Sequence, residues 1–257
     1  MILHTVEAGE GSPVALLHGL FGAARNLGVV QRALASRFRV LAMDMRNHGA
    51  SPHAAAMSYP DMAADVLETL DQRAALPAVL VGHSMGGKAA MMAALTQPDS
   101  VSRLVVADIA PVPYEHHNAE IVAALEAILL SPGLTRPAAD AALTEAVPDA
   151  ALRAFLLQNL VPGAHPHWRI GLHEIAAAMR VIEGWEAPAG AVHRGPTLFV
   201  RGAGSDYVAD EHRPAIRTLF PAARFVTLKN AGHWLHADNP SGFIAVLEAF
   251  LAGWTGG

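Results

Sequence analysis

Residues 78–95 read AVLVGHSMGGKAAMMAAL, and this stretch decides which fold the chain can adopt. An apolar run, AVLVGH, stops abruptly, and an Ala- and Met-rich stretch with helical character follows at once. Ser84 stands at the junction in a G-x-S-x-G pattern, between Gly82 and Gly86. A strand that turns sharply into a helix at this pattern lifts the serine hydroxyl clear of the sheet, beside the N–H groups of the helix. We therefore predict that Ser84 is a nucleophile rather than an incidental serine in a Gly-rich turn.

Short apolar runs along the rest of the chain alternate with helical patterns. The runs are VALLH (14–18), FRVLAMD (38–44), AVLVGH (78–83), RLVVAD (103–108), PTLFVR (196–201) and RFVTLK (224–229). Nearly continuous apolar runs are typical of parallel strands that are buried on both faces, and helices between them indicate a doubly wound sheet. ILHTVE (2–7) is a candidate edge strand.

The alternation breaks between residues 112 and 192, which we call the helical insertion. Its helical patterns are VAALEAILL (122–130), AADAALTEAV (138–147), DAALRAFLLQNLV (149–161) and HWRIGLHEIAAAMRVIE (167–183). Ligands of open α/β sheets bind at the carboxyl ends of the strands. We expect the insertion to form a cap over that edge, covering Ser84 and lining an acyl pocket with Leu, Ile and Trp side chains. Residues 1–111 and 193–257 would form the core.

A serine hydroxyl needs a base to act as a nucleophile at neutral pH. His233 follows the run at 224–229 and precedes a helix that Asn239 could cap, with Pro240 in its first turn. It therefore falls at the same edge of the sheet as Ser84. His236, in the same loop, is the alternative base, and we favour His233 because the glycine before it frees the backbone.

The composition excludes several classes of protein. The 257 residues are 52% hydrophobic and 16% charged, enough for a sizeable core and too apolar for a disordered chain. The net charge is −5 and no run of Lys or Arg occurs, so a nucleic-acid partner is not expected.

The sequence carries no signal for a metal, a cofactor or a membrane span. The chain has no cysteine, which excludes disulfides and thiolate metal sites, and the insertion's histidines (His116, His117, His165 and His167) have no metal-like spacing. A G-x-G-x-x-G or Walker pattern is missing, so neither a metal nor a cofactor is expected. The N-terminal residues lack the features of a signal peptide, and no apolar run approaches the ~18 residues of a membrane helix. These signals predict a cytoplasmic protein without a membrane partner.

Five further stretches carry a family resemblance. They are HGLFG (18–22) with NLG (26–28), DMRNHGAS (44–51), GHSMGGK (82–88), VADIAP (106–111) and AGHWLHAD (231–238). With them the chain resembles the α/β-hydrolase superfamily and, within it, a small esterase group. The resemblance implies the α/β-hydrolase fold, a mostly parallel sheet with a helical cap inserted between late strands.

The resemblance also implies an oxyanion hole made of two backbone N–H groups. These belong to Met85, after the nucleophile, and to Leu20, with Phe21 as the alternative to Leu20. Asp44, Arg46 and His48 of the DMRNHG stretch are expected to fix a turn by hydrogen bonds. Lys88 is expected to be a solvated or locally paired cation.

The catalytic acid has two candidates. Many α/β hydrolases carry it three residues after a glycine, but Gly202 is followed at that distance by Ser205, and the aspartate comes one residue later at Asp206. The esterases that the chain resembles use the aspartate that ends the preceding strand, which is Asp108 here. A strand-terminal aspartate at the ligand edge can reach the histidine loop, so we favour Asp108, keep Asp206 as the alternative, and expect Ser205 to hydrogen-bond nearby.

These residues predict a serine hydrolase. It would act through an acyl-serine intermediate on small-molecule carboxylic esters or thioesters, and the resemblance implies short to medium acyl chains. The alternatives are another reaction on the same scaffold, such as carbon–carbon bond hydrolysis, elimination or perhydrolysis, and a non-catalytic ligand receptor.

Overall fold

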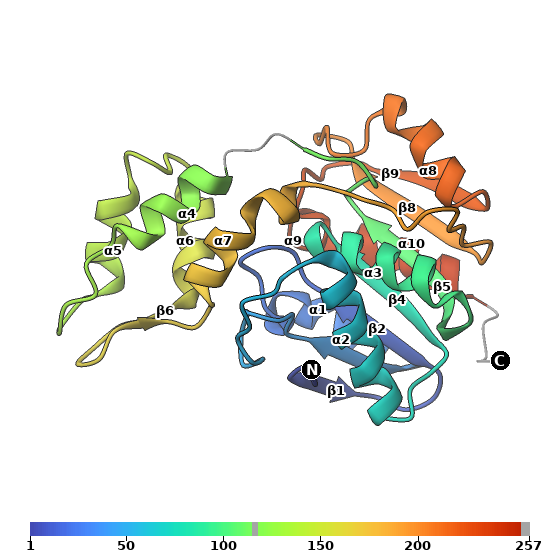
Figure 1. The fold of residues 1–257 in the computed structure, drawn as a ribbon, viewed down its shortest axis with the longest axis horizontal. Helices are drawn as coiled ribbons and strands as arrows, with labels where there is room; N and C mark the ends of the chain where they lie inside the picture. Colours follow the sequence, from blue (N-terminus) through green and yellow to red (C-terminus); the bar gives the residue numbers. More distant parts are fainter. Residues whose placement is uncertain (115–117, 253–257) are drawn as a thin grey trace.

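The central element of the fold is a seven-stranded sheet (Figure 1). The computed structural model describes residues 1–114 and 118–252, so His116 and His117 lie outside the described residues. The strand order is β1-β3-β2-β4-β5-β8-β9. β1 pairs with β3 in the antiparallel sense, and every other pairing in this sheet is parallel. The strands are β1 (Thr5–Ala8), β2 (Pro13–Leu17), β3 (Arg39–Met43), β4 (Ala78–His83), β5 (Val101–Ala107), β8 (Thr197–Gly202) and β9 (Ala223–Leu228).

The prediction of a mostly parallel α/β sheet is confirmed, because each of the six apolar runs contains a strand. The candidate edge strand forms over Thr5–Ala8 and not from residue 2. Before it, the Leu3 N–H donates to Thr69 Oγ1 at 2.9 Å and the His4 N–H to Ser51 Oγ at 2.8 Å, while the His4 carbonyl oxygen still accepts from the Asp44 N–H after β3 at 3.0 Å.

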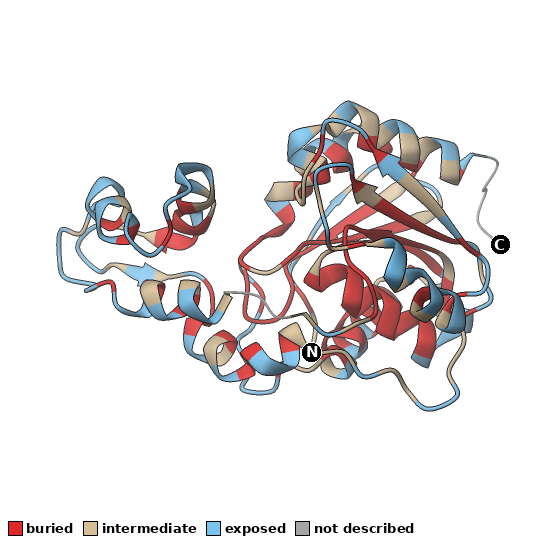
Figure 2. Cartoon of the chain, turned by 90° about the horizontal axis from the view of Figure 1, so that it is seen from above, coloured by how far each residue is buried: buried red, intermediate tan, exposed pale blue. Residues whose placement is uncertain are grey.

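Helices cover both faces of the sheet, and the strands between them are buried (Figure 2). Alternate residues of β2 show the layering: Val14 and Leu16 pack toward one layer, Ala15 and Leu17 toward the other. The helices of the two layers are α1 (Gly28–Leu34) and α10 (Pro240–Leu251) on one face, and α2 (Tyr59–Gln72), α3 (Met85–Thr96) and α8 (Arg213–Leu219) on the other.

The helical insertion lies between β5 and β8 in the chain and forms a separate group of helices in Figure 1. Its elements are α4 (Asn118–Glu126), α5 (Arg136–Leu143), α6 (Ala150–Leu156), β6 (Leu160–Val161), β7 (His167–Trp168) and α7 (Leu172–Glu183). The pattern at 167–183 predicted too long a helix, because His167 and Trp168 pair with β6 and the Gly171 N–H donates to Asn47 O at 2.8 Å. Among the helices of residues 1–114 and 118–252, none has both the length and the apolar character needed to cross a membrane.

Candidate active site

The turn at Ser84 joins β4 to α3 in a conformation that non-glycine residues rarely adopt. Ser84 has φ of 53° and ψ of −119°. The glycines on either side are required by close backbone packing. A Cβ atom at Gly82 would lie 2.3 Å from the Gly86 carbonyl oxygen, and one at Gly86 would lie 2.5 Å from the Leu17 carbonyl oxygen. Residues with such strained backbone angles occur mainly at functional sites, where the surrounding structure keeps them in that conformation.

Ser84 and His233 come together across 149 residues of sequence. The Ser84 hydroxyl lies 3.1 Å from His233 Nε2, and His233 Nδ1 lies 2.8 Å from Asp108 Oδ2. A carboxylate oxygen accepts, so Nδ1 carries the proton of the neutral ring and Nε2 is left to accept from the serine. The predicted cap of the helix after this loop is confirmed, since Asn239 Oδ1 accepts from the Gly242 N–H at 3.0 Å.

The Asp108 carboxylate is fully buried and has three donors around it. Oδ1 accepts from the Gly202 N–H at 2.9 Å, while Oδ2 accepts from the Ser205 hydroxyl as well as from His233. Asp206, the alternative acid, is exposed, and no hydrogen bond joins it to His233 within the described residues. The fold therefore brings Asp108, not Asp206, to the histidine.

The remaining neighbours hold the His233 ring and its loop. Tyr207 stacks on the ring with 3.9 Å between centroids, a contact that the sequence pattern did not reveal. His83 Nε2 donates to the His233 carbonyl oxygen at 2.7 Å, and burial lowers the pKa of His83, so it stays neutral. His236, the alternative base, lies edge-on to His83, and burial lowers its pKa to about 4. No hydrogen bond to Ser84 involves His236 within the described residues.

Leu20 and Met85, whose N–H groups were predicted to form the oxyanion hole, line the same pocket as Ser84. The N–H groups of Leu20 and Met85 have no hydrogen-bond partner among residues 1–114 and 118–252. The Phe21 N–H, the alternative to Leu20, instead donates to His48 Nε2 at 3.1 Å. His48 Nδ1 donates to Arg46 O at 2.9 Å, and burial lowers the pKa of His48 to about 3, so Nε2 remains an acceptor. The Phe21 N–H is therefore already occupied.

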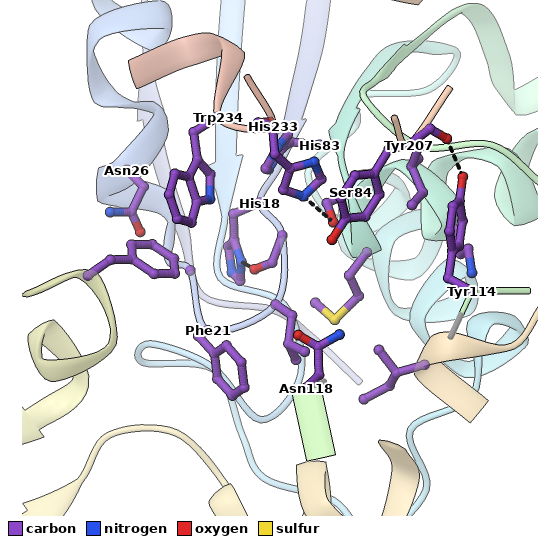
Figure 3. Close-up of a pocket in the computed structure, with 18 of the residues that line it drawn as sticks. His18, Phe21, Asn26, His83, Ser84, Tyr114, Asn118, Tyr207, His233 and Trp234 are labelled. Atoms are coloured by element: carbon purple, nitrogen blue, oxygen red, sulfur yellow. Dashed lines mark hydrogen bonds between the residues drawn. The ribbon is translucent and has the colours of Figure 1, made fainter. Parts of the chain in front are cut away.

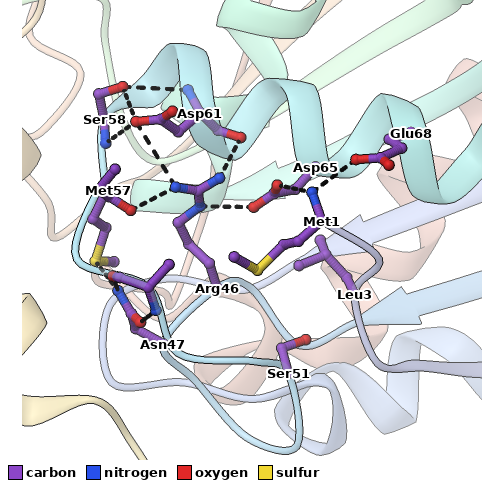
Figure 4. A network of polar contacts seen from close by, with 12 residues as sticks. Met1, Leu3, Arg46, Asn47, Ser51, Met57, Ser58, Asp61, Asp65 and Glu68 are labelled. Carbon is purple, nitrogen blue, oxygen red and sulfur yellow. Dashed lines mark hydrogen bonds and ion pairs between the residues drawn. The ribbon is translucent and has the colours of Figure 1, made fainter.

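The loop after β3 is fixed by buried polar groups, as expected from the DMRNHG stretch (Figure 4). Arg46 Nε donates to Asp65 Oδ2 at 2.7 Å, and both side chains are buried. Asp44 accepts from the Ala24 N–H at 2.7 Å and from the Ala50 N–H at 2.9 Å. These bonds tie the loop that carries His48 to the segment that follows the HGLFG turn, and so they hold the region around the candidate oxyanion hole.

A pocket of about 340 Å³ opens at Ser84 (Figure 3). Leu20, Phe21 and Trp234 line it from the core. The helical insertion contributes Tyr114, Asn118, Ile121, Leu152, Phe155, Ile182 and Glu183. The insertion therefore supplies Leu and Ile side chains as predicted, but the tryptophan of the described lining, Trp234, comes from the histidine loop. No group of three His, Asp or Glu side chains in the described part of the chain is arranged to hold a metal ion.

Lys88 differs from its prediction. The residue is 1% exposed, so it is not solvated. Nζ instead donates to the carbonyl oxygens of Gly184 at 2.7 Å and Glu183 at 3.1 Å. The sequence offered no signal for this, because the partners are main-chain atoms about 95 positions away.

Known proteins are similar to this chain in both sequence and fold. The family described as alpha/beta hydrolase fold matches residues 12–240. The mouse sn-1-specific diacylglycerol lipase ABHD11 is 43% identical over 93% of this chain and 80% of its own length. Esterase YbfF of Escherichia coli is 38% identical over 94% of both chains. The solved structure of a marine microorganism esterase superimposes with a TM-score of 0.94 at 37% identity, covering 97% of this chain and 99% of that one.

Proposed function

This chain belongs to the α/β-hydrolase fold family and is an enzyme of the hydrolase type, and on that premise we propose that it is a serine esterase. Its substrates would be carboxylic esters or thioesters with short to medium acyl chains. The hydrogen-bonded series from Ser84 through His233 to Asp108 carries the proposal. The cytoplasmic location stays a prediction.

Each group has a defined part in the proposed reaction. Ser84 Oγ attacks the acyl carbonyl carbon while its proton passes to His233 Nε2. The buried Asp108 carboxylate stabilises the imidazolium that forms and holds the ring in the required tautomer. The N–H groups of Leu20 and Met85 stabilise the negative charge on the carbonyl oxygen, and the loss of one such donor typically costs about 100- to 1,000-fold in rate.

The second half of the reaction uses the same groups. His233 gives its proton to the leaving alcohol or thiol, which departs and leaves an acyl group on Ser84. Water then attacks the acyl carbon as His233 takes one of its protons, and the carboxylic acid is released with the serine restored.

The nature of the pocket supports an acyl substrate. Ile121, Leu152 and Phe155 give the insertion side of the pocket an apolar surface that suits a hydrocarbon chain. The names of the relatives, a diacylglycerol lipase and an esterase, support an ester in preference to a carbon–carbon bond.

Covalent labelling tests the proposal. A fluorophosphonate probe should label the wild-type protein at Ser84, and Ser84→Ala should lose both labelling and ester turnover while keeping its fold by circular dichroism. Product analysis on panels of esters, thioesters and diketones separates the proposed reaction from others on this scaffold. Turnover close to the wild-type rate in Ser84→Ala would refute the mechanism.

A further inference from the structure

Lys88 lies in the first turn of α3, the helix that follows the nucleophile and is called the nucleophile helix below. Its N–H donates to the Ser84 carbonyl oxygen at 3.0 Å, so the backbone positions of the two residues are coupled. Its Nζ donates to Gly184 O and Glu183 O, at the carboxyl end of α7. The side chain thus links the nucleophile helix to the last helix of the insertion. The proposed catalysis does not use it.

The end of α7 receives other donors at the same place. The Tyr59 hydroxyl on α2 donates to Ile182 O, and the Tyr114 N–H donates to Glu183 O at 2.9 Å. The last carbonyl groups of a helix have no partner within the helix and must find one elsewhere. Here three successive carbonyls, of residues 182, 183 and 184, are satisfied from outside the helix, and Lys88 supplies two of these bonds.

Both segments that connect the insertion to the core pass Lys88. Before the first helix of the insertion the chain passes Tyr114, whose ring centroid lies 4.9 Å from Nζ, and after α7, its last helix, the chain passes Gly184. The ring of Tyr59 lies 5.5 Å from Nζ on α2. Tyr114 also donates its hydroxyl to the carbonyl oxygen of Tyr207, the residue that stacks on His233. The amine therefore occupies the junction of the two connections and the catalytic helix.

We propose that Lys88 is a positioning residue: its two hydrogen bonds hold the end of α7 against the nucleophile helix and thereby set the geometry of the acyl pocket at Ser84. Ile182 and Glu183, whose carbonyl groups are held at this junction, also line the pocket. The part of this inference that concerns acyl substrates rests on the proposed function. The contact between Lys88 and the end of α7 is a property of the fold and does not rest on it.

The two hydrogen bonds from Lys88 to the end of α7 do not depend on the protonation state of the amine. An ammonium group has three N–H donors and a neutral amine has two, and the two carbonyl acceptors need two. Among residues 1–114 and 118–252, the titratable groups facing it are Glu183, Tyr59 and Tyr114. Burial lowers the pKa of Lys88 to about 7, against a smaller opposing effect of the Glu183 carboxylate.

Lys88→Met tests the inference, because methionine fills similar space without a donor. Lys229→Met, at the exposed lysine of the chain, is the matched control. One readout is amide hydrogen exchange in the last turn of α7, which needs no catalysis. The other is the ratio of kcat/KM for p-nitrophenyl octanoate to that for p-nitrophenyl acetate. Fluorophosphonate labelling of Ser84 in each variant shows whether a negative result concerns the positioning role of Lys88 or the proposed function.

We expect Lys88→Met to speed amide exchange in the last turn of α7 by about 10-fold or more, because the loss of one or two hydrogen bonds makes local opening more frequent by about that factor. The ester ratio should change by about 5-fold or more. Lys88→Arg, which keeps N–H donors, should fall between Lys88→Met and the wild type, and Lys229→Met should match the wild type.

Two results would overturn the inference: unchanged exchange in a folded Lys88→Met, or equal losses on both esters. If Lys88→Met does not fold, Lys88→Gln takes its place, because glutamine keeps an N–H₂ donor on a side chain that is one methylene group shorter. Unchanged exchange in Lys88→Gln would then overturn the inference.

Discussion

Asp108→Asn should inactivate the enzyme by changing which nitrogen of His233 carries the proton. Asp108 Oδ1 accepts from the Gly202 N–H at 2.9 Å, and Oδ2 accepts from His233 Nδ1 at 2.8 Å. The Gly202 donor is a main-chain group that cannot rotate, so the asparagine oxygen should stay opposite it. The asparagine NH₂ group then faces His233, where Nδ1 must accept, and the ring proton moves to Nε2.

The magnitude follows from the loss of the base. A protonated Nε2 in the neutral ring donates to Ser84 Oγ, at 3.1 Å, and cannot take the serine proton. In another serine hydrolase the equivalent change lowers kcat about 10,000-fold, which corresponds to about 5.5 kcal/mol of activation free energy. We expect a loss of that order here, because His233 Nδ1 meets the same kind of buried carboxylate. Stability should change little, since asparagine has nearly the same shape.

The assay is kcat on an activated p-nitrophenyl ester, with folding checked by circular dichroism. Asp206→Asn is the matched control. Asp206 is exposed and does not hydrogen-bond to His233 in the described part of the chain, so its loss should cost less than about 3-fold. Activity of Asp108→Asn within about 10-fold of the wild type, or a collapse in Asp206→Asn, would refute the reasoning.

Three further predictions address the oxyanion loop, the pocket and the buried lysine. His48→Leu removes the acceptor of the Phe21 N–H and should lower kcat about 10- to 100-fold with little change in KM; steady-state kinetics checks this, and an unchanged kcat would contradict it. Phe155→Ala enlarges the apolar side of the pocket and should shift the kcat/KM ratio toward longer acyl chains by about 10-fold, as a chain-length series would reveal; an unaltered ratio would count against an acyl site there. The pKa of Lys88 is about 7 in the fold, against an ordinary value of 10.5, so the unfolded chain binds more protons between these pH values. The free energy of unfolding of the wild type, minus that of Lys88→Met, should therefore rise by up to about 5 kcal/mol between pH 7 and pH 10.5. Urea unfolding of both proteins measures this difference, and a difference that does not change with pH would contradict the burial of the amine.

The strands of the sheet and the nucleophile turn could be predicted from the amino-acid sequence. The apolar runs specify strands because a strand buried on both faces needs apolar side chains at every position, as Val14 to Leu17 provide. The turn at Ser84 is partly local information, since a Cβ atom at Gly82 would collide with Gly86, four residues on. The requirement for glycine at position 86 comes from the distant backbone of Leu17. The Asn239 cap and its Pro240 are local information, because a cap joins residues three apart.

The tertiary structure alone decided which of two neighbouring candidates faces the site. Asp108 and Asp206 both follow strands at one edge of the sheet, and the difference between them is the direction of a side chain. That direction depends on bonds to Gly202 and Ser205, which lie 94 and 97 positions away from Asp108. In the same way, the hydrogen bond from the Phe21 N–H to His48 joins residues that are 27 positions apart in the sequence. Lys88 carries no local sign of burial, because its acceptors are backbone carbonyls that come within reach only when the insertion packs on the core. Periodicity and turn chemistry act over a few residues, whereas these contacts exist only after distant segments have packed together.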